Sequence, residues 1–235
     1  MRTVTLNLGL RYEGEGGFSE PFNRLSDFDP TLTNPLTNTP GAILYASPSD
    51  NTLQNNHFGL FAPRIGVAWN PKPSVVVRAG YGVYYVPISA QQNFSSTPPG
   101  YAISYSQVVA NPSSPMPFME LDTGAPAYTV PTAANRTPAI SNGQSISYFP
   151  PNAPQAYMQE WQVGIQKQLG TSWVTEISYV GSKGTHLLYP RDSNQVPQAD
   201  FKPGALQSYR PFPQYQTITT YFDDAISDYL SLIHI

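Results

Sequence analysis

The sequence contains no cysteine, few charged residues and no long apolar run. Without cysteine, the chain has no disulfide framework, no thiolate zinc site and no cysteine nucleophile. Charged residues make up only 11% of the chain and its formal net charge is −3, so a nucleic-acid partner is not expected. No apolar stretch approaches the roughly 18 residues of a transmembrane helix. No secretory signal precedes the first patterned segment, so if the protein is exported we expect Met1 not to be its true beginning.

Aromatic residues and proline are abundant by contrast. Aromatic residues reach 13%, with 16 Tyr, and there are 25 Pro. Disordered chains are usually poor in aromatic residues and rich in charge, so this composition excludes wholesale disorder.

Five segments alternate apolar and polar residues. The apolar side chains take even positions in the first segment and odd positions in the other four. Successive side chains of a strand point to opposite faces, so this period of two predicts strands with one apolar face. Each run has roughly 9–12 residues, the length that a tilted strand needs to cross a bilayer. The segments are residues 3–13, 61–70, 74–85, 156–169 and 172–181.

The fourth segment also allows a helical interpretation, from the spacing of Met158, Trp161 and Ile165. We favour a strand, because Gly164 and Gly170 interrupt the helical pattern and a natural hairpin partner follows.

The connections between the segments alternate between long and short. Pro71-Lys72-Pro73 and Gly170-Thr171-Ser172 make tight turns. The long connections are rich in proline and polar residues, and cover residues 14–60, 86–155 and 183–213. Structureless connections beyond about 12–15 residues are uncommon in compact soluble domains. The sequence therefore predicts an all-β, antiparallel up-and-down meander: a partial transmembrane β-barrel wall with short periplasmic turns and long extracellular loops. The alternative is a soluble antiparallel sandwich with one wet face.

The aromatic and charged residues are distributed over the two faces as expected for a barrel wall. On the apolar face, aromatic residues gather at both ends of the strands, as in the two belts of a membrane-spanning wall. The belts comprise Trp69 and Trp173 at the turn end, and Tyr12, Phe61, Tyr85 and Tyr157 at the loop end. The polar face carries charges that would line the lumen, namely Arg11, Arg64, Arg78, Glu160 and Glu176. Lys167 falls on the apolar face near the turn end, where its long stem can reach the interface.

The residues that could carry chemistry form no recognisable site. The three histidines, His57, His186 and His234, are too far apart in sequence for a metal-ligand pattern. Aspartates at 27 and 29 and at 223, 224 and 228 could offer oxygen to calcium, but neither group has an EF-hand-like loop. No phosphate-binding loop and no nucleophile elbow appears. We therefore expect a protein that is not an enzyme and has no cofactor. Loop aromatics such as Phe94 and Tyr101 could contact a sugar or peptide, or could simply pack within the loops.

Several segments resemble a known family. Residues 6–13 (LNLGLRYE) resemble a strand of TonB-dependent outer-membrane receptors, and Pro211-Phe212-Pro213-Gln214-Tyr215 is similar to a further recurring segment. Other segments, in this order, resemble the Oar-like branch of that superfamily: residues 62–71, 76–85, 161–169 and 177–187.

This resemblance implies a barrel of about 22 strands with a plugged lumen. It implies energised uptake or export of an unknown substrate in the outer membrane of a Gram-negative cell. The partners would be outer-membrane lipid, the protein's own plug domain and the TonB complex; no plug or TonB-contacting segment can be matched in this chain. We expect residues 1–229 to form about five to six strands of such a barrel. An adhesin or surface structural protein, or a passive porin without TonB coupling, is the alternative.

The last six residues invite a separate hypothesis. The family members that this chain resembles continue differently after Tyr229, and residues 230–235 match one translated frame of a sequencing adapter. We predict that these six residues are non-native, which the nucleotide sequence tests directly.

Overall fold

The computed structural model describes residues 3–87, 122, 136–204 and 206–234. These residues are almost entirely β, and the only helices among them are two short 3-10 turns, η1 (Gln198–Asp200) and η2 (Leu206–Tyr209). Among the described residues, no helix has the length and hydropathy needed to span a membrane. The strands are β1 (Val4–Glu15), β2 (Ser26–Thr33), β3 (Pro40–Tyr45), β4 (His57–Lys72), β5 (Val75–Tyr85), β6 (Ile146–Tyr148), β7 (Tyr157–Leu169), β8 (Trp173–Asp192) and β9 (Ile218–His234).

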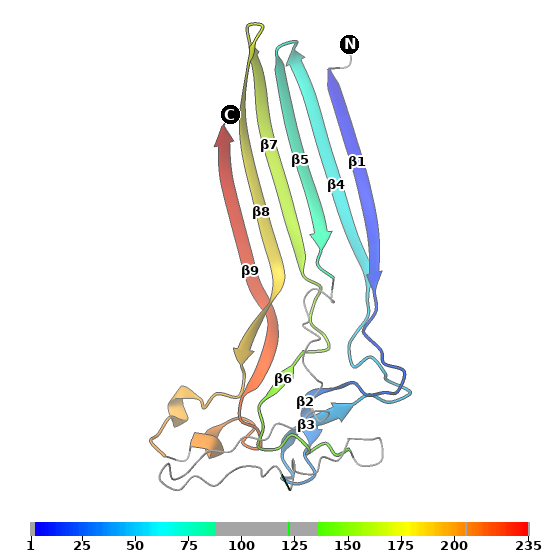
Figure 1. Cartoon of the computed structure of the whole chain (residues 1–235), viewed down its shortest axis with the longest axis vertical. Helices are drawn as coiled ribbons and strands as arrows, with labels where there is room; N and C mark the ends of the chain where they lie inside the picture. The colour runs from blue at the N-terminus through cyan, green and yellow to red at the C-terminus, as the bar shows by residue number, and fades with distance from the viewer. Residues whose placement is uncertain (1–2, 88–121, 123–135, 205, 235) are drawn as a thin grey trace.

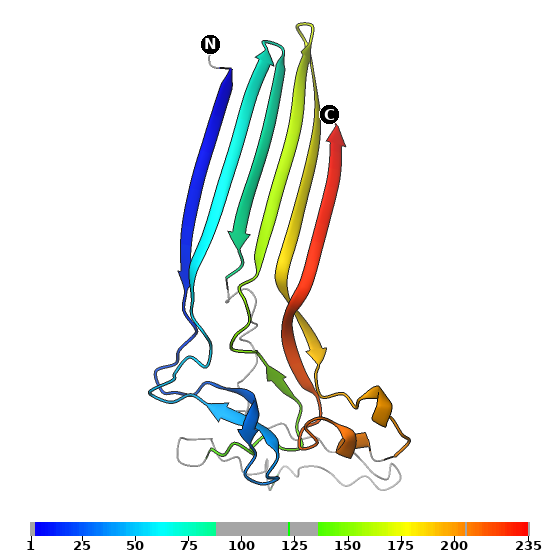
Figure 2. The same cartoon turned by 180° about the vertical axis from the view of Figure 1, so that it is seen from behind.

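Six long strands form a single open wall in the order β1-β4-β5-β7-β8-β9, each antiparallel to its neighbour (Figures 1 and 2). The short turns β4–β5 and β7–β8 lie at one end of the wall, and the long connections lie at the other. The short strand β6 pairs in parallel with the beginning of β9 and completes the sheet at the long-loop end. The expected antiparallel meander is confirmed, and the sheet does not close on itself.

The register explains why these sequences pair as they do. Directly opposed residues of an antiparallel pair share a face. Leu8 opposes Ile65, which opposes Tyr81, which in turn opposes Trp161. A slip of one residue in any pair would move an entire apolar set to the polar face, so the alternation itself specifies the register.

Two strands of the wall are longer than the sequence suggests, and one strand of the wall was not predicted. β4 begins at His57, and β8 continues to Asp192, so the connection expected over 183–213 begins ten residues later than predicted. Gly181 and Gly184, which resemble the end of a strand in sequence, lie inside β8. Each sits where a neighbour approaches closely: Trp161 beside Gly181, and Ser227 beside Gly184. Glycine in these positions therefore marks tight packing and not a strand end.

The unpredicted strand β9 pairs with β8 along most of its length, and its last residues, Leu230 to His234, belong to this ladder. The hypothesis that residues 230–235 are non-native stays a prediction.

β-Bulges separate the wall from the long-loop end. On β4, Gly59 is the extra residue between Phe58 and Leu60, and its φ of +106° suits glycine. On the opposite side of the wall, the β8–β9 register shifts between Gly184 and Leu187, and His186 adopts a φ of +58°. Bulges increase local twist, and beyond them the strands turn toward the long-loop end (Figure 1).

The long connections contain a packed layer, which we call the cap: the β2–β3 hairpin, β6 and the described parts of residues 136–156 and 193–217. Its core is a cluster of five buried side chains: Phe28, Ile43, Ile146 and Tyr215 of the cap, and Ile218 at the beginning of β9. The ring of Phe28 meets those of Tyr148, Phe212 and Tyr215 edge-on at 5.1–5.5 Å between centroids. The connections over 14–60 and 86–155, predicted as loops, therefore contain strands, and the main hydrophobic core of the described residues lies here.

Candidate functional site

The apolar face of the wall is a continuous exposed surface. Leu8 and Leu10 leave 72% and 68% of their surface exposed, in a row of side chains that a soluble protein would bury. The indole of Trp161 on β7 lies directly over Gly181 on β8. A Cβ placed on that glycine would lie only 2.6 Å from two indole atoms, so no larger residue fits there without a shift. The indole thus covers backbone that lacks a side chain.

The predicted aromatic belts lie on this face, at the predicted ends. Tyr12 opposes Phe61, with ring centroids 5.2 Å apart, and Tyr85 opposes Tyr157 at 6.0 Å. At the turn end Trp173 is 75% exposed. Trp69 is also exposed and opposes Val4 and Val77. The contact of these rings with lipid stays a prediction.

Polar residues interrupt the apolar face one row inside the loop-end belt. Gln159 opposes Lys183, and Lys183 opposes Asp228. The hydroxyl of Tyr81 donates to Gln159 Oε1 at 2.8 Å. In the same row, β1 and β4 carry Leu10 and Pro63. The apolar band is therefore narrower on the β7–β9 side than on the β1–β4 side.

The opposite face is polar and hollow. A depression of about 890 Å³ lies on it, over strands β1, β4, β5, β7, β8 and β9. Arg64, Arg78 and Glu160 line it, together with small residues such as Gly66 and Gly80. Small side chains leave room for the hollow, and charged ones line it; this combination is expected of the inside of a barrel.

All five predicted lumen residues share this face, and four have a partner there. Arg11 forms an ion pair with Glu13 at 2.6 Å, and the guanidinium of Arg64 lies 4.7 Å from the centre of the Tyr84 ring. Arg78 donates to Gln166 Oε1 at 3.1 Å, and Glu176 accepts from Ser178 Oγ at 2.9 Å. Such exposed pairs contribute little stability. Their common orientation is the informative feature, and access to the lumen stays a prediction.

In the cap, residues 193–217 form an excursion held by side-chain amides. Asn194 is fully buried, and its Nδ2 donates to the carbonyls of Phe212, Tyr215 and Gln216 at 2.8–3.0 Å. Arg210 donates from Nη1 to the carbonyls of Asn194 and Gln216 at 2.7 and 2.9 Å. These side chains satisfy backbone carbonyls that no strand pairs, so they hold the excursion in place where it has little regular structure. The family-like segment 211–215 supplies part of this network.

A carboxyl group is enclosed where the hairpin meets β6. Burial raises the pKa of Asp27 from 3.8 to about 8, against the effect of the backbone N–H groups of Phe28 and Phe149, which favour the charged form. The nearby charge of Asp29 adds to the increase in pKa. The packing of the cap therefore favours the protonated form of Asp27.

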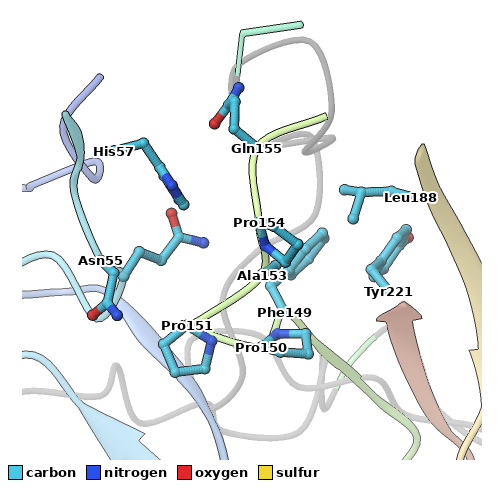
Figure 3. A pocket seen from close by; sticks show the side chains of 11 residues that line it. Asn55, His57, Phe149, Pro150, Pro151, Ala153, Pro154, Gln155, Leu188 and Tyr221 are labelled. Atoms are coloured by element: carbon cyan, nitrogen blue, oxygen red, sulfur yellow. The ribbon is translucent and has the colours of Figure 1, made fainter. Parts of the chain in front are cut away.

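A small cavity lies where the cap joins the wall (Figure 3). His57 lies on one side of it and Leu188 and Tyr221 on the other, with the proline-rich segment 150–154 between them. Gln155 Nε2 donates to Glu15 Oε2 at 3.1 Å and to the carbonyl of Val86, so it joins the ends of β1 and β5. The cavity volume of about 30 Å³ accommodates one or two water molecules and no larger ligand.

The structure brings no metal-ligand set together within the described ranges. No three His, Asp or Glu side chains gather there as potential ligands. His57 lies at the cap junction, while His186 Nδ1 lies 3.3 Å from the carbonyl oxygen of Asp223 in the β8–β9 bulge. Phe94 and Tyr101, considered above as ligand contacts, lie outside the described residues.

An antiparallel wall with one aromatic-edged apolar face, one hollow polar face and loops of unequal length is the architecture of a transmembrane β-barrel section. The chain belongs to the outer membrane beta barrel domain family, whose model matches residues 1–233. This membership confirms the expected location in the outer membrane. No curated protein matches the chain significantly.

Solved structures that are similar to the chain include two receptors. One is a double mutant of the hemophore receptor HasR of Serratia marcescens in complex with its hemophore HasA and heme, at 13% identity and a TM-score of 0.43. The other is the siderophore receptor PirA of Pseudomonas aeruginosa, at 12% identity and a TM-score of 0.37. The matches cover 98% and 83% of this chain, but only 28% and 26% of those receptors. The chain thus spans about a quarter of their length.

Proposed function

We propose that this chain is one section of the barrel of a TonB-dependent, Oar-like outer-membrane transporter, which takes up or exports a substrate with energy from the inner membrane. The observation that carries this proposal is the pairing of an exposed apolar face with a hollow, charged inner face across six strands. The segments that resemble Oar-like receptors support the energised mechanism.

In this proposal the polar face takes part in transport, and the apolar face anchors the protein in the membrane. Arg64, Arg78 and Glu160 would face a plug domain inside the barrel, where ion pairs can form and break as the plug moves. Outer-membrane lipid would cover the row that contains Leu8 and Ile65. The long-loop end, with the cap, would face the cell exterior and meet substrate first. The protein would carry out no covalent chemistry and would need no cofactor.

The full-length gene and protein test the proposal. A plug domain and a TonB box encoded before this segment would support energised transport, and a barrel without them would favour a passive porin or a surface structural protein. A pull-down of the full-length protein with the periplasmic domain of TonB provides the biochemical counterpart. Outer-membrane fractionation with heat-modifiable migration on gels tests the barrel separately, and a soluble monomer would contradict it.

A further inference from the structure

A surface hollow in the cap has the size of a small-molecule site. It lies beside the 193–217 excursion and has a volume of about 720 Å³. Ligand sites commonly measure about 300–1,000 Å³. Its lining comprises Asp192, Gln195, Val196, Gln198, Phe201, Leu206 and Arg210.

The apolar part of the lining presents an uncovered aromatic ring. Phe201 is 69% exposed, although it follows directly on η1 and its backbone N–H is held by the carbonyl of Gln198 at 3.4 Å. Val196 and Leu206 extend the apolar surface beside it. An exposed ring on a fixed backbone offers a flat platform to a ligand that has an apolar face.

The polar part of the lining suits a ligand rich in hydroxyl groups. Gln195 and Gln198 line the hollow, and each side-chain amide can donate and accept a hydrogen bond at once. Arg210 donates from Nη1 to the backbone carbonyls of Asn194 and Gln216, so its guanidinium belongs to the frame of the hollow. Asp192 Oδ2 lies 3.8 Å from Arg210 Nη1, so the two charges compensate and the hollow favours a neutral ligand.

The frame of the hollow is rigid before any ligand arrives. Asn194 donates to three backbone carbonyls of the excursion, and Arg210 donates to two. Gln207 Nε2 also donates to the carbonyl of Pro213 at 2.8 Å. Asp192 Oδ1 accepts from the N–H groups of Asn194 and Ile218 at 2.9 and 3.1 Å. A site whose frame is already ordered loses little entropy on binding.

We propose that this hollow binds a neutral saccharide, with the face of one sugar ring on Phe201 and its hydroxyl groups on Gln195 and Gln198. A sugar ring combines an apolar C–H face with hydroxyl groups that both donate and accept, and this matches the two parts of the lining. The inference goes beyond the transport proposal, because binding at the cap requires neither a plug nor an energised membrane.

The test is binding of neutral oligosaccharides by the full-length protein in detergent, on an array that also carries acidic oligosaccharides and tripeptides. We expect neutral saccharides to bind. Phe201→Ala should weaken binding roughly tenfold or more, and Gln198→Ala should weaken it too. The matched control is Phe22→Ala, which removes another exposed ring of the long connections (73% exposed) that does not line the hollow.

Three outcomes would overturn the proposal: no neutral saccharide binds, tripeptides or acidic sugars bind in preference, or Phe201→Ala binds as well as the parent protein. Heat-modifiable migration shows that each variant is folded. Because no energised membrane is present, a failed binding test and a failed transport test remain distinguishable.

Discussion

Two substitutions at neighbouring positions of β1 test which face of the wall meets lipid. Leu8 and Asn7 lie at nearly the same height and point to opposite faces. Leu8 opposes Ile65 on the apolar face and is 72% exposed, whereas Asn7 opposes Gly66 on the hollow face. An arginine in place of each residue therefore adds the same charge at the same depth on opposite sides.

The magnitude follows from the position of Leu8 between the belts. It lies four residues from Val4, which opposes Trp69, and four from Tyr12. At about 3.3 Å per residue and a tilt of about 40°, each belt lies roughly 10 Å away along the membrane normal. Leu8 is therefore near the bilayer midplane, where arginine costs about 2–4 kcal/mol. Asn7→Arg should cost much less, because water or polar groups solvate its charge on the hollow face.

Reversible denaturant unfolding of the full-length protein in lipid vesicles, followed by tryptophan fluorescence, measures both variants. We expect Leu8→Arg to lower the free energy of unfolding by about 3 kcal/mol, roughly a hundredfold in the folding equilibrium. Equal losses for the two variants, or a larger loss for Asn7→Arg, would refute the assignment of the faces.

Three further predictions concern the packing of the wall and the cap. Gly181→Val should destabilise the wall by about 1–3 kcal/mol, because its side chain would overlap the indole of Trp161; in the double variant with Trp161→Ala, unfolding assays should show most of that loss recovered. The pKa of Asp27 is raised from 3.8 to about 8, so the folded cap binds the proton more tightly than the unfolded chain. The resulting stability should be fully present below about pH 4 and be lost as the pH rises through 8; thermal unfolding of Asp27→Asn should lack this pH dependence, and an unchanged profile would contradict the assignment. Asn194→Ala removes the amide nitrogen that donates to three backbone carbonyls, so limited proteolysis should cleave within residues 193–217 faster than in the parent, while the exposed control Asn152→Ala should show no change.

The wall could be predicted from sequence because its determinants are local. The alternation in residues 3–13 and 74–85 specifies strand, face and register together, since a strand repeats every two residues. The charges of Arg64 and Glu160 and the rings of Tyr12 and Phe61 fell on the predicted faces for the same reason.

The cap could not be predicted, because its determinants are non-local. Phe28, Ile146 and Tyr215 meet in one core although more than sixty residues of chain separate each from the next. Short strands without clear alternation, such as β6, form only because such contacts hold them. β9 escaped prediction because a bulge shifts its alternation midway, and Asp223, Asp224 and Asp228 obscure its apolar positions.

The sequence by itself determined that this chain builds an antiparallel wall with one apolar and one charged face, because the two-residue period of a strand translates directly into sides of a sheet. Only the tertiary structure decided that the long connections pack into a rigid cap, that Gly181 receives an indole, and that a hollow opens beside Phe201. These features depend on which distant segments of the chain meet. The local sequence does not indicate that Asn194 will satisfy backbone carbonyls or that the carboxyl group of Asp27 will be enclosed.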